Sequence, residues 1–286
     1  MLADAIISGI LFGGIYALIA SGFSIALSFT RILNLAHGEI MIFAAYFCYF
    51  IFKSFGIDPF LSLLIILPIF FFVGFVFYSG LSRYSRRANL ESVLLLFIAI
   101  STILQNLGLL FWLSTQRSIT LSYLVNPIII LGINISPIYL VGGLAGFAII
   151  LGLHFFLTKT KSGLAIRAIP QDAELAATTG INYFLMGRIA FGLAFLCAGL
   201  AGAMVAVMFT FNPTSGLSSL LIALSVVVLG GLGSIFGCLV GGLILGVVGS
   251  IASYYFGSGV QLLIGYIIFL IVLLIKPKGL FGRYVL

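Results

Sequence analysis

Long uncharged stretches of apolar residues recur along nearly the whole chain, and they decide in which solvent it can fold. Of the 286 residues, 63% are hydrophobic and only 7% are charged, whereas soluble domains carry about 25% charged residues. A helix needs about 20 apolar residues to cross the hydrocarbon core of a bilayer. The apolar runs are 5–29, 39–52, 59–81, 92–113, 137–157, 184–211, 220–255 and 259–275. We therefore predict an all-α, polytopic transmembrane helix bundle that uses residues 1–286 as a single domain.

The seventh run, 220–255, is too long for one simple span. Its segment GGLGSIFG, Gly230–Gly237, is rich in glycine, which weakens a continuous helix. We predict a broken or re-entrant element there, which gives about eight or nine spans in total. The candidate residues for a translocation path in this element are Gly230, Gly231, Gly233 and Ser234.

Basic clusters between the apolar runs predict orientation, because Lys and Arg are enriched in cytoplasmic loops. The clusters are Arg83, Arg86 and Arg87; Lys159, Lys161 and Arg167; and Lys276, Lys278 and Arg283. An odd number of complete crossings then places the N-terminus outside, whereas an even number with a re-entrant element places it in the cytoplasm; both alternatives stay open. This distribution accounts for the formal charge of +7 without nucleic-acid binding.

Small residues recur at a spacing of four in two of the predicted helices. Such stripes let helix backbones approach closely, which is how helices attract one another in lipid. The stripes are Gly9, Gly13, Ala17 and Ser21, and Ala190, Ala194, Ala198, Gly202 and Ala206. We predict packing inside the bundle, with a dimer interface as the alternative.

The segment Arg31–Glu39, RILNLAHGE, holds three ionisable side chains in nine residues between two long apolar runs. Because charged groups in a membrane are costly, such a cluster indicates either a break that faces a cavity or a cytoplasmic turn. In the first interpretation the segment lines part of a translocation path with Asn34, His37, Gly38 and Glu39. In the second, Arg31 is a topology charge and Glu39 lies near a helix N-terminus, where the dipole favours a carboxylate.

The segment Lys159–Asn182 interrupts the apolar pattern with charged and turn-forming residues. Pro170 is suited to the first turn of a short helix, Asp172 and Glu174 suit its N-terminus, and Gly180 stops it about ten residues later. We predict a cytoplasmic coupling helix with apolar contacts to the bundle and charged residues available to a soluble partner. The alternative is a plain loop lying on the bilayer.

The chain lacks sequence signatures of catalysis and of metal binding. Cys48, Cys197 and Cys238 lie in apolar runs without ligand spacing, so they are predicted to be small buried residues. The phosphate-loop pattern GxxxxGK[ST] and the metalloprotease pattern HExxH are absent. We therefore predict no catalytic residues, no metal site and no cofactor in this chain.

Three stretches, in this order, are similar to one known family: Ile15–Tyr46, Ser162–Asn182 and Val227–Gly246. Over essentially its whole length the chain resembles the permease subunits of ABC importers for branched-chain amino acids, also called the hydrophobic amino acid uptake type. In that family the second stretch docks into an ATPase subunit. The matching residues are Gly163, Arg167, Asp172, Glu174, Ala176, Gly180, Ile181 and Asn182. The leucine-proline pair that ends the wider ABC-permease pattern does not follow them.

The resemblance implies an importer in a bacterial-type inner membrane, with this chain as a multi-pass subunit in contact with lipid. Its partners would be a second permease, similar or identical, two ATP-binding subunits that hold ATP and Mg²⁺, and an extracellular or periplasmic solute-binding protein. The implied solute is a branched-chain amino acid, with urea or short amides as the alternative. A rival class is a proton-coupled secondary transporter, for which His37 and Glu39 are the nearest candidates.

Overall fold

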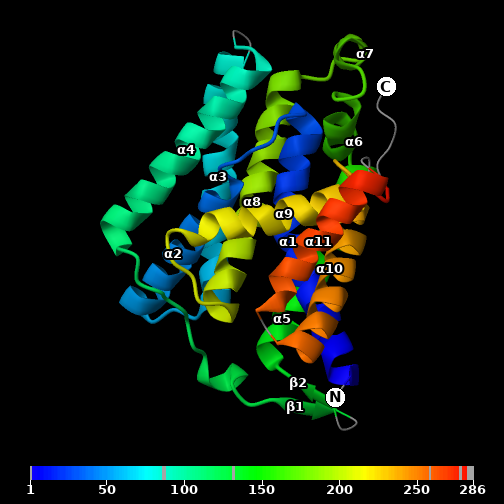
Figure 1. Cartoon of the computed structure of the whole chain (residues 1–286). Helices are drawn as coiled ribbons and strands as arrows, with labels where there is room; N and C mark the ends of the chain where they lie inside the picture. The colour runs from blue at the N-terminus through cyan, green and yellow to red at the C-terminus, as the bar shows by residue number, and fades with distance from the viewer. Residues whose placement is uncertain (1, 86–87, 131–132, 258, 277–278, 282–286) are drawn as a thin grey trace. The chain divides into compact units, whose positions relative to one another are not determined.

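The computed structural model describes residues 2–85, 88–130, 133–257, 259–276 and 279–281 (Figure 1). The helices are α1 (Leu2–Thr30), α2 (His37–Phe55), α3 (Pro59–Ser85), α4 (Leu90–Trp112), the 3₁₀ turn η1 (Ser122–Leu124), α5 (Pro137–Lys159), α6 (Lys161–Ala168), α7 (Ala173–Thr178), α8 (Tyr183–Met208), α9 (Ser215–Gly230), α10 (Ile235–Phe256) and α11 (Val260–Ile275). The strands are β1 (Ile128–Ile130) and β2 (Ile133–Ile135). Of the basic residues used to predict orientation, Arg86, Arg87, Lys278 and Arg283 lie outside the described residues.

The predicted polytopic all-α bundle is confirmed. In the described part of the chain, seven helices are long and apolar enough to cross a membrane: α1, α2, α3, α4, α5, α8 and α10. Two further apolar helices, α9 and α11, have 16 residues each. Each predicted apolar run therefore corresponds to one helix, except the seventh, which gives α9 and α10.

The interruption between α9 and α10 is the broken element predicted at Gly230–Gly237. Helix α9 ends at Gly230, and Gly231 and Gly233 take the left-handed φ values of 106° and 79°. The Ser234 hydroxyl then accepts a hydrogen bond from the Gly237 amide at 3.0 Å and caps α10. Glycine permits the sharp turn and serine restarts the helix, so this break is encoded locally.

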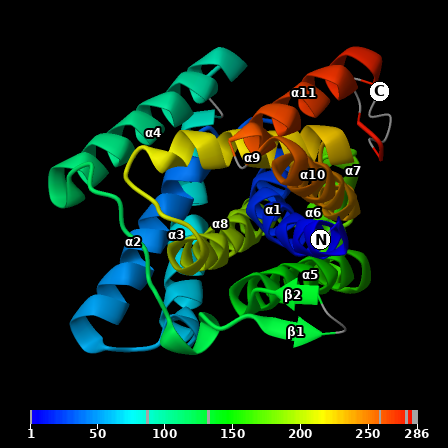
Figure 2. The same cartoon turned by 60° about the horizontal axis from the view of Figure 1, so that its bottom comes forward.

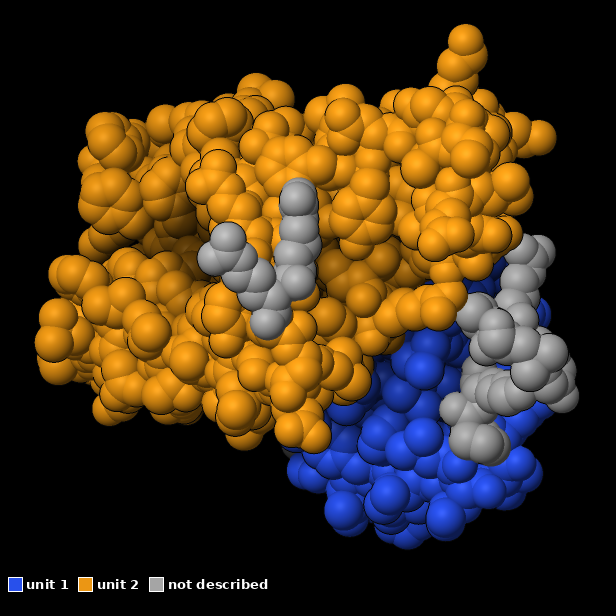
Figure 3. Space-filling view, turned by 90° about the horizontal axis from the view of Figure 1, so that it is seen from above, with its two compact units in different colours: residues 1–21, 120–153, 221–286 blue, residues 22–119, 154–220 orange. Residues whose placement is uncertain are grey.

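The chain forms two compact units (Figure 3). The α10 unit comprises residues 1–21, 120–153 and 221–286, and the α8 unit comprises residues 22–119 and 154–220. Three of the four boundaries fall inside α1, α5 and α9, and the fourth, at 119/120, lies between α4 and η1. The prediction of one transmembrane domain stays a prediction.

In the α8 unit, α8 packs along α3 and α2 (Figure 1). The predicted stripe of small residues on α8 is buried throughout. A Cβ added to Gly202 would overlap the carbonyl oxygen of Met41 on α2, and one added to Gly74 of α3 would overlap that of Phe191 on α8. The stripe therefore brings backbones together inside the unit, as close packing in lipid requires.

In the α10 unit, the glycines of α1 pack against α10. A Cβ on Gly9 would lie 2.7 Å from Val247 Cα, and one on Gly13 would lie 2.7 Å from Leu243 Cα. The Ser250 hydroxyl also donates a hydrogen bond to the Ala5 carbonyl at 2.7 Å. Strands β1 and β2 form an antiparallel hairpin just before α5 (Figure 2).

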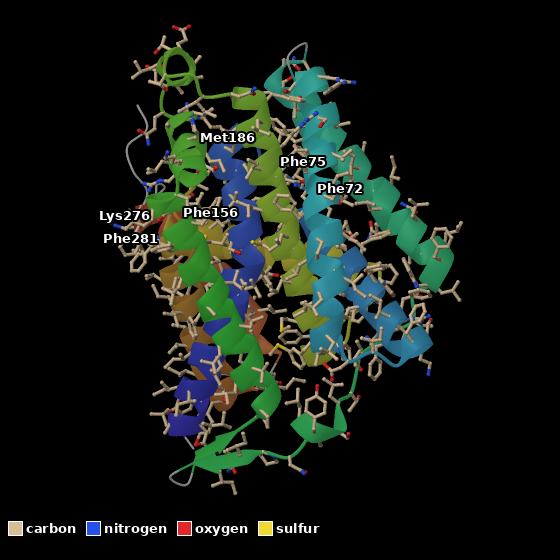
Figure 4. All side chains as sticks on the ribbon, turned by 180° about the vertical axis from the view of Figure 1, so that it is seen from behind. Phe72, Phe75, Phe156, Met186, Lys276 and Phe281 are labelled. Carbon is tan, nitrogen blue, oxygen red and sulfur yellow. The ribbon has the colours of Figure 1, made fainter. Side chains whose placement is uncertain are left out.

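Large apolar side chains on α3 and α4 remain exposed. Leu64 is 76% exposed, Phe72 64% and Leu110 73%, and Figure 4 labels Phe72 on the outside of α3. Apolar surface on this scale is unfavourable in water and suits lipid contact. These faces agree with the membrane assignment that the composition indicates.

Candidate functional site

The loop between α5 and α8 contains two short helices, α6 and α7, so the prediction of one helix with Pro170 in its first turn was wrong. Pro170 lies in the turn between α6 and α7, and α7 begins at Ala173. Side-chain caps determine where α6 and α7 begin. The Thr160 hydroxyl accepts from the Gly163 amide at 3.0 Å, and Asp172 Oδ1 accepts from the Leu175 amide at 2.9 Å. A helix begins where such a cap satisfies its unpaired amides, and the proline is not needed for that.

The residues predicted to form the coupling loop divide into an anchoring group and a surface group. Gly163 and Ala176 are buried, and a Cβ on Gly163 would overlap the carbonyl oxygen of Phe156 in α5, which Figure 4 labels. The surface group is exposed or half-buried and consists of Arg167, Asp172, Glu174, Gly180, Ile181 and Asn182. We call residues 160–182 the α6–α7 segment.

The exposed face of the α6–α7 segment mixes charge with apolar area. Leu164 is 50% exposed and Leu175 64%, close in sequence to the exposed carboxylates of Asp172 and Glu174. Gly180 turns the chain with a left-handed φ of 80°. The side chain of Asn182 then accepts from the Leu185 amide at 3.0 Å and caps α8. A force on α7 therefore has a short, ordered connection to the start of α8.

Arg31 connects this segment to the end of α1. Its guanidinium donates a hydrogen bond to the carbonyl of Pro170. Arg31 itself has a left-handed φ of 57°, which non-glycine residues adopt rarely. The first residue of RILNLAHGE thus contacts the turn between α6 and α7, a link that the sequence does not predict.

The polar side chains of RILNLAHGE that follow Arg31 are buried. Helix α1 ends at Thr30 and α2 begins at His37, so the segment is a turn, and Arg31 is exposed. Asn34 and His37 are each 1% exposed and Glu39, in the first turn of α2, is 3% exposed. Each interpretation of the sequence retains support: the turn is present, but its polar side chains point into the unit. A path lined by these residues stays a prediction.

Asn34 and His37 are held by the backbone and by α1. Asn34 Oδ1 accepts from the Ala36 amide at 3.2 Å, and the Asn34 carbonyl accepts from the His37 amide at 3.1 Å. Within the described residues Asn34 Nδ2 is buried without a hydrogen-bond partner. The His37 ring lies 5.9 Å from that of Phe23, and a Cβ on Gly22 would lie 2.9 Å from His37 Cε1.

Glu39 lies against the start of α9. Its carboxyl group fills the space that a Cβ on Gly216 would need, and a Cβ on Gly38 would overlap the Gly216 carbonyl oxygen. The first turns of α2 and α9 are therefore in backbone contact. The carboxyl group of Glu39 makes no hydrogen bond or ion pair with another described residue. No sequence motif marks Gly216, which is why the sequence analysis missed it.

The other predicted path residues lie in the α10 unit, around the break after α9. Gly230 and Gly231 are buried, whereas Gly233 and Ser234 are half-buried. The amides of Leu280 and Phe281 donate to the carbonyls of Leu229 and Gly230 at 2.9 and 3.0 Å. The backbone after α11 thus satisfies carbonyls at the C-terminal end of α9, near Phe281, which is labelled in Figure 4. A path role for these residues stays a prediction.

Three further polar groups are buried without a hydrogen-bond partner in the described part of the chain: Ser24 Oγ, Tyr46 OH and Arg117 Nε. The Tyr46 ring stacks on Trp112 with centroids 4.2 Å apart, and the Arg117 guanidinium lies 5.2 Å from the centre of the Tyr49 ring. The sequence analysis did not select them. The sequence signal that could have identified them was a polar residue within or beside an apolar run.

The described residues contain no group of three or more His, Cys, Asp or Glu side chains that could hold a metal ion. Cys48, Cys197 and Cys238 are buried and form no disulfide within the described residues, and their burial agrees with their apolar surroundings in the sequence.

A family model described as "Branched-chain amino acid transport system / permease component" matches residues 5–275. The chain belongs to this family. The resemblance seen in the sequence is therefore confirmed, and the chain is a membrane permease component of a transport system.

Curated relatives match over nearly their full length. The permease protein LivH of Salmonella typhimurium, named for high-affinity branched-chain amino acid transport, is 28% identical over 96% of this chain and 94% of its own. A probable LivH of Methanocaldococcus jannaschii is 29% identical over 96% and 90%, and BraD of Pseudomonas aeruginosa 27% identical over 97% and 95%. The solved structure of PsaBC from Streptococcus pneumoniae in complex with Fab matches 97% of this chain and 91% of that one, at 16% identity and a TM-score of 0.47.

Proposed function

We propose that this chain forms the translocation path of an ATP-driven importer for branched-chain amino acids in a bacterial-type inner membrane. The family match across residues 5–275 carries the proposal. The relatives named above are branched-chain amino acid permeases by their names. Leucine, isoleucine and valine are therefore the first solutes to test, with urea and short amides as the alternative.

The α6–α7 segment is the proposed docking element for an ATPase subunit. Its support is the combination of exposed charge, exposed leucines and firm anchoring through Gly163. Closure of paired ATPases would push on α7, and the connection through Gly180, Ile181 and Asn182 would pass that movement to α8. Because α8 packs along α3 and α2, its displacement would move much of the α8 unit.

ATP and Mg²⁺ are proposed to bind the partner ATPases, because this sequence has no GxxxxGK[ST] phosphate loop. The complete assembly would contain two permeases, identical or similar, two ATP-binding subunits and a solute-binding protein outside the membrane. This chain contributes the path and the docking segment, and holds no cofactor of its own.

The proposed path includes two sets of residues, one in each compact unit. The set Asn34, His37, Gly38 and Glu39 is supported by buried polar groups in a membrane protein, because such groups are costly and are usually functional. The set Gly230, Gly231, Gly233 and Ser234 is supported by the helix break, since irregular backbone at membrane depth is tolerated where it faces protein or a cavity.

The test combines purification and uptake. The chain is purified from native membranes in mild detergent, its co-purifying proteins are identified by mass spectrometry, and the complex is reconstituted for uptake of labelled leucine. Recovery of an ATPase and ATP-dependent leucine uptake are expected. Recovery of this chain alone, in detergent that preserves comparable complexes, would overturn the importer proposal and favour a secondary transporter based on Glu39 and His37. ATP-dependent uptake of urea but not of leucine would overturn the assignment of a branched-chain amino acid as the solute.

A further inference from the structure

Glu39 is a carboxylate buried in the α8 unit, and no described residue of that unit is a cationic partner for it. It is 3% exposed, and none of its hydrogen-bonding capacity is used by another described residue. Ionisable side chains within membrane segments normally pair with one another, bind backbone groups or mark the route of a substrate. The absence of a pair among these residues leaves the carboxylate available to a ligand.

The N-terminus of α9 beside Glu39 is an opposite and equally unused group. Helix α9 has 16 residues, and the amides of Gly216 and Leu217 in its first turn have no acceptor within the helix. No acceptor outside the helix is found for them among the described residues either. The preceding Asn212 does not supply one, because its Oδ1 already accepts from the Thr214 amide and from two hydroxyl groups. The helix dipole makes this end attractive to a carboxylate.

Two glycines hold the carboxylate and the helix end together. Gly38 and Gly216 allow the first turns of α2 and α9 to touch, and the Glu39 carboxyl lies in the space that a side chain on Gly216 would take. A negative group and a partly positive group are therefore adjacent. An α-amino acid carries an ammonium and a carboxylate on the same carbon, so its two charges have the same close spacing with the opposite signs.

We propose that Glu39 and the first turn of α9 form a recognition site for the zwitterionic end of an α-amino acid. The Glu39 carboxylate binds the solute's ammonium, and the amides of Gly216 and Leu217 donate hydrogen bonds to its carboxylate. This inference rests on the proposed function and makes it more specific. A neutral solute such as urea cannot replace either charge interaction, so the site selects amino acids within the membrane path, in addition to any selection by a binding protein.

The direct test is ligand binding to the purified permease–ATPase complex, without the separate solute-binding protein, by saturation-transfer difference NMR. The probes are leucine, 4-methylpentanoate, which lacks the amino group, and leucinamide, which lacks the carboxylate. Leucine is expected to bind more tightly than both analogues. In Glu39→Gln its apparent Kd should rise about tenfold or more, because charge-assisted hydrogen bonds are lost. The matched control is Glu91→Gln, an exposed glutamate in the first turn of α4, which should leave binding unchanged.

Two outcomes would overturn the site: equal binding of 4-methylpentanoate and leucine, or unchanged leucine binding in Glu39→Gln. If Glu39→Gln fails to assemble, Glu39→Asp is used instead, because it keeps the negative charge but shortens the side chain by one methylene. This variant should weaken the binding of leucine more than the binding of 4-methylpentanoate. An equal loss for both probes would count against the site. Uptake by the wild-type complex separates the two hypotheses: without leucine uptake the proposed function fails, whereas with uptake and an unaffected Glu39→Gln only this site fails.

Discussion

The α6–α7 segment and Arg31–Glu39 both interrupt apolar helices with polar residues, but they are built in opposite ways. We call Arg31–Glu39 the buried segment, because its Asn34, His37 and Glu39 are buried although Arg31 is exposed. The α6–α7 segment is organised by neighbours in sequence, since Thr160 and Asp172 each cap the helix that follows, and its charges are exposed. In the buried segment, Glu39 meets Gly216, a residue from a distant part of the chain. A change in the first should therefore affect communication with a partner, whereas a change in the second should affect packing and the solute.

The largest effect is expected from Gly38→Ala. The new Cβ would overlap the Gly216 carbonyl oxygen, and overpacking against fixed backbone costs about 1–3 kcal/mol. We expect a lower melting temperature in detergent and strongly reduced leucine uptake. Gly80→Ala is the matched control, because a Cβ at this helical glycine meets nothing within 4 Å. Equal stability of the two variants would show that close contact of α2 and α9 is unnecessary.

Replacing Glu174 and Arg167 together by alanine should have the next largest effect. If these side chains contact an ATPase, their loss should lower leucine uptake about tenfold, as for important interface residues, while the permease stays inserted. ATP hydrolysis would become uncoupled from uptake, which is measured by assaying both in the same proteoliposomes. Lys53→Ala, at an exposed position at the end of α2, serves as the control. Unchanged uptake in the double variant would remove the docking assignment.

His37→Ala tests the buried segment without altering the exposed one. We expect uptake to change roughly threefold to tenfold, the range of single polar contacts between membrane helices, while the ATPase still co-purifies. The control is His154→Ala, at an exposed position on α5. Loss of assembly in His37→Ala, rather than altered transport, would favour the interpretation of RILNLAHGE as a structural turn.

The smallest effect is expected from the cap of α7. Asp172→Ala removes the hydrogen bond from the Leu175 amide and should destabilise this short helix by about 1 kcal/mol. The expected measurement is roughly fivefold faster hydrogen exchange of the backbone amides of α7. Asp172→Asn retains a good cap but removes the charge. Slower uptake in both variants would show that the charge of Asp172 contributes to docking. Slower uptake in Asp172→Ala alone would show that the helix cap is what matters for uptake.

Most features that depend on neighbouring residues were predicted correctly. The run 59–81 corresponds to α3, Pro59–Ser85, because the length of an apolar stretch alone decides whether it can cross a bilayer. The helix break at Gly231–Ser234 followed from glycine content in the same way. The start of α7 was misplaced, because a proline suited to a first turn was preferred over the capping side chain of Asp172.

The sequence by itself determined the solvent, the positions of the long apolar helices, the family and the stripes of small residues that pack. The tertiary structure decided which stripe meets which partner: Gly13 meets Leu243, Gly202 meets Met41, and Gly216 receives Glu39. The physical reason is that residue spacing defines the packing face of a helix but not the face opposite it. Lipid gives apolar faces no hydrophobic reason to prefer one another, so shape and close backbone contact select the partners.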